Sequence, residues 1–180
     1  VLLGIMYSRG ARAIAEQFGK DAKWGQDLID NFYKSFPSIK EIITRSMYQA
    51  EKLGYVCTIT GRKRRLPNMK LDKENYLYQE ASRQCLNARI QGSSADVMKL
   101  AMINLYNHPR FQELGGKILM TIHDEMVIEC RDEVALEMAE LLPEVMKDTA
   151  KNLLGTKQKC DVEMSRVWSG DDCTNELKCS

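Results

Sequence analysis

The stretch Lys117-Ile118-Leu119-Met120-Thr121-Ile122-His123-Asp124-Glu125-Met126-Val127-Ile128-Glu129-Cys130 predicts two antiparallel strands joined at a tight turn. Ile118, Met120 and Ile122 alternate with more exposed positions, and Met126, Ile128 and Cys130 continue the period of two. The tip carries His-Asp-Glu, where folding alone would favour Asn-Gly or Asp-Gly. Adjacent carboxylates repel each other unless a cation or solvent compensates, and Mg²⁺ takes oxygen ligands. The segment therefore indicates either a magnesium-binding tip or a solvated acidic turn.

The composition is that of an ordinary globular chain. Its 180 residues, 44% hydrophobic and 28% charged, suffice for one good core or for one domain and part of another. No apolar run approaches the roughly 20 residues that a membrane span needs, and no signal peptide is visible. The six cysteines form no Cys-x-x-Cys pair, which argues against a zinc site and for reduced thiols. We therefore expect a cytoplasmic protein that has no membrane partner.

Charge is distributed unevenly along the chain. Residues 1–100 hold 17 Lys and Arg against 10 Asp and Glu, whereas residues 101–180 hold 9 against 15. A basic half beside an acidic half suits a protein that holds a polyanion while doing metal chemistry. It equally suits two halves that pair with each other.

The order of the expected elements indicates an α+β fold. Helical spacing of apolar residues predicts helices over 9–18, 21–35 and 38–53, followed by a strand at 54–60. A further helix is expected at 74–90, and a break at 92–96 precedes one that runs to Asn107, where Pro109 stops it. After the hairpin we expect a helix over 132–153, a strand at 160–164 and a polar tail.

Two groups of polar residues are candidates for nucleic-acid contact. Arg83, Asn87 and Gln91 follow the i, i+4, i+8 pattern and share one helix face, where Asn and Gln can donate to and accept from base edges. The alternative is a solvated helix face. Arg62-Lys63-Arg64-Arg65 predicts salt-sensitive phosphate contact at a strand end. A solvated charge run or a localisation signal is the alternative there.

Taken in order, four segments resemble the C-terminal part of family A DNA polymerases, the DNA polymerase I family. Gly4-Ile5-Met6-Tyr7 resembles the end of the fingers-helix motif, and Gly54-Tyr55-Val56 through Gly61-Arg62-Lys63-Arg64-Arg65-Leu66-Pro67 resembles the Gly-Tyr-Val…Gly-Arg-Arg…Leu-Pro segment. Arg83…Asn87…Gln91-Gly92…Ala95-Asp96 resembles the DNA-facing helix pair, and His123-Asp124-Glu125 resembles the catalytic hairpin of the palm. The similarity extends to about Trp168.

The resemblance implies a role for each matching residue. Asp124 would be one of two aspartates that hold two catalytic Mg²⁺ ions, Glu125 an auxiliary carboxylate, and His123 a neighbour of the primer terminus. Tyr7, which from its apolar surroundings is either a core tyrosine or a base-stacking platform, would lie at the insertion site near the template base. The trio on the helix face would contact the primer-template duplex from the minor-groove side.

The resemblance further implies a DNA-directed DNA polymerase that adds dNTPs to a primer by a two-metal mechanism. Residues 1–53 would be the C-terminal part of the fingers, and residues 54–180 the palm. The family's triphosphate-gripping Arg and Lys and its other metal-binding aspartate have no counterpart here, and Leu3 stands where Phe or Tyr is usual. We therefore expect a fragment that needs the missing N-terminal polymerase part and is inactive alone. The departure at Leu3 favours a phage or prophage origin.

Two other classes of function remain open from the sequence. One is a non-catalytic nucleic-acid-binding module that derives from a polymerase and keeps only the duplex-facing helix. The other is an unrelated metal-dependent phosphohydrolase built on the acidic hairpin. A metal-binding aspartate encoded upstream in the same gene would favour the polymerase. Cleavage of phosphoesters without template or primer would favour the hydrolase.

Overall fold

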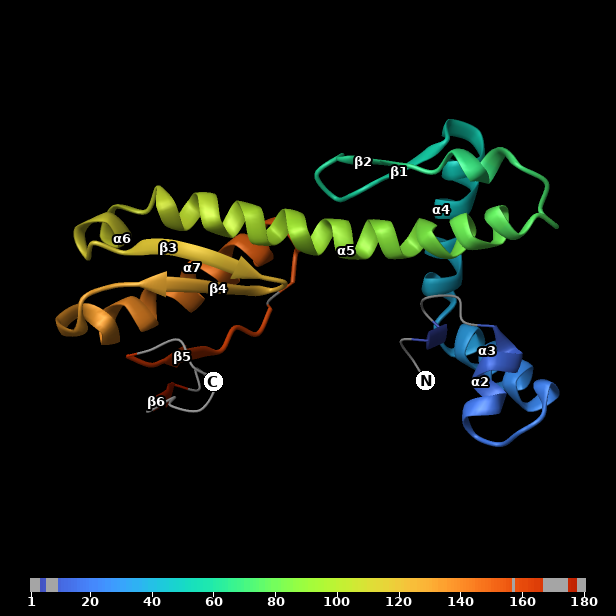
Figure 1. The fold of residues 1–180 in the computed structure, drawn as a ribbon, viewed down its shortest axis with the longest axis horizontal. Coiled ribbons are helices and arrows are strands. Elements are labelled where there is room, and N and C mark those ends of the chain that lie inside the picture. Colours follow the sequence, from blue (N-terminus) through green and yellow to red (C-terminus); the bar gives the residue numbers. More distant parts are fainter. Residues whose placement is uncertain (1–3, 6–9, 157, 167–174, 178–180) are drawn as a thin grey trace. The chain divides into compact units, whose positions relative to one another are not determined.

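The computed structural model describes residues 4–5, 10–156, 158–166 and 175–177. Helices and short antiparallel strand pairs make up these residues, which confirms the predicted α+β class (Figure 1). The chain divides into two compact units, Val1–Ser93 and Ser94–Ser180, and helix α5 belongs partly to each. This division reflects which residues pack together, and it does not test the expected boundary between fingers and palm after Leu53, which stays a prediction.

The elements carry the labels of Figure 1. The α-helices are α2 (Ala11–Gln17), α3 (Ala22–Ser35), α4 (Pro37–Leu53), α5 (Tyr76–Tyr106), α6 (Pro109–Glu113) and α7 (Ala135–Leu154), and the 3₁₀ turns are η1 (Pro67–Lys70) and η2 (Asp132–Val134). The strands pair as β1 (Tyr55–Cys57) with β2 (Lys63–Arg65), β3 (Lys117–Ile122) with β4 (Glu125–Glu129), and β5 (Val162–Met164) with β6 (Asn175–Leu177).

Capping residues explain where the first helices begin and end. Asp21 precedes α3, and its Oδ1 accepts a hydrogen bond from the backbone N of Trp24 at 2.8 Å. Gly54 ends α4 in the left-handed conformation, at a φ of 76°, which a residue without Cβ adopts freely. The helices α2 and α3 meet at Gly25, where a Cβ would lie 2.2 Å from the carbonyl oxygen of Ala11.

Proline begins helices in this fold. Pro37 and Pro109 each occupy the first turn of a helix, where the missing N–H would have had no helical partner. The expectation that Pro109 only stops a helix is therefore incomplete, because a short helix, α6, starts there.

A buried apolar cluster holds α4, the β1–β2 hairpin and the start of α5 together. Its members lie on all of these elements and are at most 4% exposed: Ala50, Val56, Leu66, Met69, Tyr78, Ala81 and Cys85. Burial raises the pKa of the Cys85 thiol to about 11, so the thiol stays protonated and unreactive at neutral pH. The Tyr78 hydroxyl donates a short hydrogen bond to Glu51 Oε1, and Lys73 Nζ lies 3.5 Å from the same oxygen.

Helix α5 is one continuous helix of 31 residues, so the predicted break at residues 92–96 is wrong. Glycine inside a helix costs about 1 kcal/mol relative to alanine, which is why Gly92-Ser93-Ser94 suggested an end. The structure shows another use for Gly92. A Cβ there would lie 2.6 Å from Thr58 Cγ2, so the absent side chain makes room for the β1–β2 loop.

The second unit is built on a core between α7 and the β3–β4 hairpin. Leu105, Phe111, Leu114, Met138, Leu141 and Val145 form its buried centre, and Ile118, Met126, Ile128 and Cys130 pack against them from the hairpin. Helix α7 therefore covers one face of the β3–β4 pair (Figure 1). The expected strand at 160–164 is present as β5, and it pairs with β6, which the sequence placed in a polar tail. Over the described ranges, none of the helices combines the length and apolar character that crossing a membrane requires.

Replacing Tyr78 with Phe should lower the free energy of unfolding by about 1.5–3 kcal/mol at pH 8, the scale of a hydrogen bond to a charged group. Burial, with the hydrogen bond to Glu51, raises the pKa of Tyr78 to about 12, against about 10 in an unfolded chain. This stabilisation is therefore complete below pH 10 and is lost as the pH rises toward 12. Urea unfolding at pH 8 and pH 11 should show the difference between the two proteins shrinking.

The matched control is Tyr76→Phe, two residues earlier on α5 and 75% exposed, which should leave stability unchanged at both pH values. Equal losses for the two variants, or a loss for Tyr78→Phe that does not depend on pH, would contradict the assigned role of the hydroxyl.

Candidate functional site

The tip of the β3–β4 hairpin is a two-residue turn made of His123 and Asp124. Ile122 and Glu125 pair across it, so Glu125 is the first residue of β4. His123 has a φ of 55°, in the left-handed region that such hairpin turns use at their first position. This conformation costs a non-glycine residue about 1 kcal/mol or more, and backbone strain of this kind is found most often at functional sites. The turn therefore presents Asp124 from a constrained backbone.

A β-bulge interrupts strand β3 shortly before this tip. The pairing shifts by one residue between Ile118 and Met120, which leaves Leu119 as the extra residue. Ile118 pairs with Ile128 on the buried face, whereas Met120 pairs with Val127 on the opposite face and is 41% exposed. The predicted alternation, which placed Met120 beside Ile118 on one face, is therefore wrong. An inserted residue reverses the alternation for the rest of the strand.

The acidic turn offers oxygen ligands to solvent. His123, Asp124 and Glu125 are all exposed, so neither carboxylate is withdrawn from water. Carboxylate oxygens on a hairpin that is packed from behind suit a hard divalent cation. Within the described ranges, however, no three His, Cys, Asp or Glu side chains are arranged to hold a metal ion. Asp124 and Glu125 thus fit part of a magnesium ligand set and do not form a complete one.

Arg83, Asn87 and Gln91 lie on α5 at the predicted spacing, within the first unit. Arg83 and Gln91 are exposed, which suits contact with a partner. Asn87 is only half-exposed, and its Oδ1 is buried without a hydrogen-bond partner among the described residues. A buried amide oxygen without a partner is uncommon, because its desolvation costs about 1–3 kcal/mol. Asn87 therefore differs from the solvated face that was the alternative prediction.

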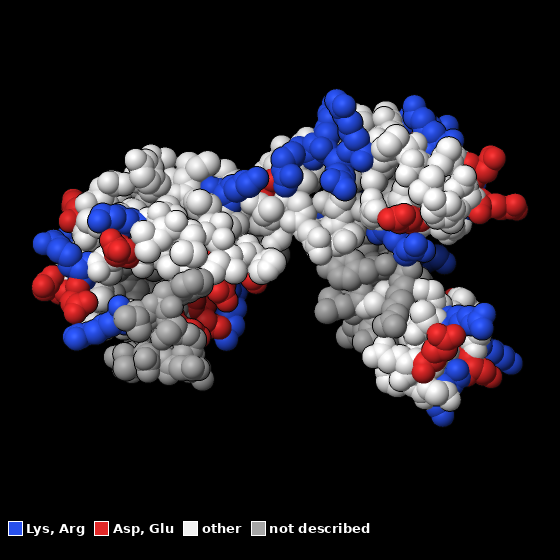
Figure 2. Space-filling view, viewed as in Figure 1, with Lys and Arg blue, Asp and Glu red and all other residues white. Residues whose placement is uncertain are grey.

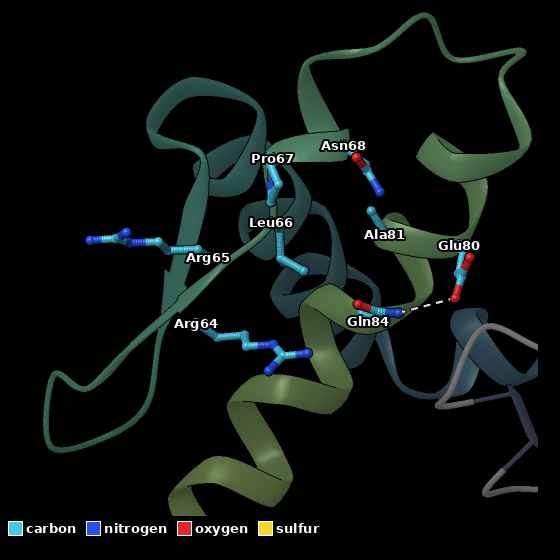
Figure 3. Close-up of a pocket in the computed structure, with 8 residues that line it drawn as sticks. All are labelled: Arg64, Arg65, Leu66, Pro67, Asn68, Glu80, Ala81 and Gln84. Carbon is cyan, nitrogen blue, oxygen red and sulfur yellow. Dashed lines mark hydrogen bonds between the residues drawn. The ribbon is translucent and has the colours of Figure 1, made fainter.

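The four predicted cations of the β1–β2 hairpin are divided between its two faces. Arg64 pairs with Val56, which is buried, and Arg65 pairs with Tyr55. Paired residues share a face and successive residues alternate, so Lys63 and Arg65 lie opposite Arg64. Figure 3 shows Arg64 directed toward α5 and Arg65 directed away from it. The one basic cluster predicted from the sequence is thus two pairs.

A shallow polar pocket of about 230 Å³ lies between the hairpin and the start of α5. Arg64 and Asn68 line it from one side, and Gln84 and Glu80, which are joined by a 3.4 Å hydrogen bond, line it from α5 (Figure 3). The lining includes two cations, Arg64 and Arg65, and one carboxylate, Glu80, so a ligand there would meet charges of both signs.

The loop of the β1–β2 hairpin is attached to α5 at the two residues that follow Gln91. The Ile59 backbone N donates to Ser93 Oγ at 2.9 Å, and Arg62 Nη2 donates to the carbonyl oxygen of Gly92 at 2.9 Å. Because Gly92 has no side chain, the loop can approach the helix backbone directly. The loop and the part of α5 that carries Gln91 therefore form one structural piece.

Two side-chain contacts of α5, made by Ser93 and Arg89, could not be predicted from the sequence. Ser93 was predicted only as part of a helix break, and its hydroxyl proves to be an acceptor for the loop. Arg89 was not singled out, and its Nη1 donates at 2.9 Å to Oγ of Ser46, a fully buried residue of α4. Such pairs join residues 34 and 43 positions apart in the chain, so no local spacing could have found them.

The structure brings the hairpin cations and the α5 trio together in the first unit, and it places the acidic turn in the second. Tyr7, the expected insertion-site residue, and Leu3 lie outside the described residues.

Comparison with known proteins gives one consistent result. The family model of DNA polymerase family A matches residues 1–170. The thermostable DNA polymerase I of Thermus filiformis is 32% identical over 93% of this chain and 20% of its own length. DNA polymerase I of Chloroflexus aurantiacus is 32% identical over 86% of this chain and 16% of its own. The chain thus spans about a fifth of the length of these curated relatives.

A solved structure agrees with these relatives. The POL domain of Pol1 from M. smegmatis, in complex with DNA primer-template and dNTP, superposes with a TM-score of 0.75 at 30% identity. The match covers 82% of this chain and 26% of that one.

Replacing Gly92 with Ala should destabilise the protein by about 1 kcal/mol, although alanine is the better helix former. The gain in helix propensity is about 1 kcal/mol, whereas crowding a packed contact costs about 1–3 kcal/mol. The new Cβ would lie 2.6 Å from Thr58 Cγ2. Thr58→Ser removes that methyl group and keeps the hydroxyl that accepts from the Arg62 backbone N. Urea unfolding of both single variants and the double variant measures the coupling.

In the Thr58→Ser background, Gly92→Ala should become neutral or stabilising. The control is Gly25→Ala, whose new Cβ would lie 2.2 Å from the carbonyl oxygen of Ala11 and does not meet Thr58, so Thr58→Ser should not rescue it. A Gly92→Ala variant that is more stable than the natural sequence would show that the loop does not need the glycine.

Proposed function

The chain belongs to DNA polymerase family A, and we propose that it supplies part of the active site of a DNA-directed DNA polymerase. The reaction is nucleotidyl transfer from a dNTP to the 3′-hydroxyl of a primer on a template. The observation that carries the proposal is the exposed Asp124 at the tip of the β3–β4 hairpin, which is held in place because one of its faces packs on α7. The family match over residues 1–170 supports the choice of reaction over phosphoester hydrolysis.

Asp124 is proposed to be a ligand for catalytic Mg²⁺. Its constrained turn and packed hairpin restrict the positions that its carboxylate can take, which reduces the reorganisation needed on binding. Bound Mg²⁺ would supply a more acidic primer hydroxyl and stabilise charge at the reacting phosphate. Because the described residues hold only part of a ligand set, Asp124 would act with a carboxylate from elsewhere in the complete protein.

Glu125 and His123 have proposed roles beside Asp124. Glu125 starts β4 on the face of Met120 and Val127, away from the α7 core, so its carboxylate is available as an auxiliary ligand or proton carrier. His123 is exposed at the first turn position, where its ring can contact the primer terminus.

Arg83, Asn87 and Gln91 are proposed to contact the primer-template duplex in the minor groove. Minor-groove acceptors occupy similar positions in every Watson–Crick pair, so donors there test pair geometry without reading sequence. The exposed Arg83 and Gln91 supply such donors, and the anchored loop beside Gln91 stiffens that part of α5. The hairpin cations are proposed to supply phosphate contact, and Tyr7 to lie at the insertion site.

In the complete protein, Asp124→Asn should reduce the single-turnover rate of primer extension by at least about a thousandfold. One ligand charge is lost, while duplex affinity changes little because Lys and Arg elsewhere still contact phosphate. Asp148→Asn, an exposed aspartate on α7, is the control and should keep the wild-type rate. Near-normal extension by Asp124→Asn at saturating Mg²⁺ would make the turn a solvated loop. Duplex binding by a wild-type protein without any extension would favour the binding module.

Gln91→Ala should cost about 1–2 kcal/mol in transition-state stabilisation, the scale of one hydrogen bond lost from a desolvated interface. Extension from matched primer ends should slow, discrimination against mismatched ends should change, and template sequence preference should not. Asn87→Ala and Arg83→Ala should act in the same direction. The control is Gln26→Ala on α3, whose amide pairs with Asp30. If all three variants match the wild type on matched and mismatched ends, the face is only solvated surface.

A further inference from the structure

The outer face of the β1–β2 hairpin joins two cations to an aromatic ring. Lys63 and Arg65 lie on the face of Tyr55, and Lys63 Nζ is 4.6 Å from the centroid of the Tyr55 ring. Both cations are exposed, and Figure 2 shows Lys and Arg side chains gathered over this hairpin. Their Cα atoms are about 6.6 Å apart, from a rise of about 3.3 Å per residue. The face can therefore offer two positive charges along one line.

Arg62 has different surroundings, although it stands next to Lys63 in the chain. Its backbone closes the hairpin loop, because its N donates to Thr58 Oγ1 at 3.1 Å and its carbonyl accepts from Thr58 N at 2.9 Å. Its side chain turns toward α5 and donates to the carbonyl oxygen of Gly92. A helical carbonyl has a second lone pair for such a donor, so the helix stays intact. The guanidinium is thus committed to the helix side of the hairpin.

The loop that Arg62 closes has a second attachment that carries no charge. Ser93 Oγ accepts from the Ile59 backbone N, and Gly61, at a φ of 86°, provides the left-handed residue that the three-residue loop needs. Arg62 and Ser93 therefore hold the same loop to adjacent residues of α5. Loss of either one should loosen the hairpin in the same way, whereas only one of them is charged.

We infer that the hairpin cations, which the proposed function takes as one phosphate-binding group, have separate tasks. Lys63 and Arg65 bind the phosphate backbone of a nucleic acid, whereas Arg62 leaves that group and is a positioning residue that holds the loop on α5 beside Gln91. The inference rests on the proposed function, because it takes primer-template DNA as the ligand. A cation that neutralises a phosphate releases a counterion, so its contribution depends on salt. A cation that anchors a loop affects the affinity equally at every salt concentration.

The test is equilibrium binding of the complete protein to a primer-template duplex over about 50–300 mM salt. Lys63→Gln and Arg65→Gln should each reduce the slope of log K against log salt by about 0.9. Arg62→Gln removes the same charge and should keep the wild-type slope, with a several-fold weaker affinity throughout. Ser93→Ala should reproduce the Arg62→Gln pattern, and adding it to Arg62→Gln should weaken binding by less than the product of the two effects.

The control for charge loss is Lys40→Gln on the exposed side of α4, which should change neither slope nor affinity. A slope that falls by about 0.9 in Arg62→Gln would overturn the inference, as would an unchanged slope in both Lys63→Gln and Arg65→Gln. Either result with normal primer extension by the wild type leaves the proposed function standing. A wild-type protein that neither binds the duplex nor extends a primer overturns both.

Discussion

The close approach of the β1–β2 loop to α5 at Gly92 is the constraint on which the proposed nucleic-acid face of the first unit depends. Gly92 and Ser93 are weak helix formers, and alone they would favour an interruption. The helix continues through them because the loop packs against the missing side chain, and because Arg62 and Ser93 give it two hydrogen bonds. The position of the hairpin cations relative to Gln91 therefore depends on this approach, together with the buried cluster that joins the hairpin to the start of α5.

The effect of the hairpin cations depends on which face of the hairpin each one occupies, as well as on their number. Four consecutive cations would repel each other on one surface, but alternation in β2 and its loop sends neighbours to opposite faces. Arg62 donates a hydrogen bond to α5 and Arg64 is directed toward α5, whereas Lys63 and Arg65 share a face with Tyr55. In the proposed complex, the nucleic acid would meet Lys63 and Arg65 directly, whereas Arg62 holds the hairpin loop on α5.

The acidic turn combines order with exposure. Packing of one hairpin face on α7 fixes the strands, and the bulge at Leu119 moves Met120 to the opposite face. The tip itself stays in water, with a left-handed His123 before Asp124. A metal-binding carboxylate needs this combination. Burial of the carboxylate would add a desolvation cost, and mobility would add an entropy cost when the metal binds. The proposed polymerase function draws on both properties.

Local signals in the sequence were enough for the α+β class, the helices before Leu53, the β3–β4 hairpin and α7, because caps, glycines and apolar periodicity act over a few residues. The spacing of Arg83, Asn87 and Gln91 also determined that they share a helix face. Three features depended on tertiary contacts: the unbroken α5, the bulge at Leu119 and the anchoring of Arg62. Each arises where distant segments meet, at Thr58 against Gly92 or β3 against β4, and the energy of such contacts outweighs local preferences of about 1 kcal/mol.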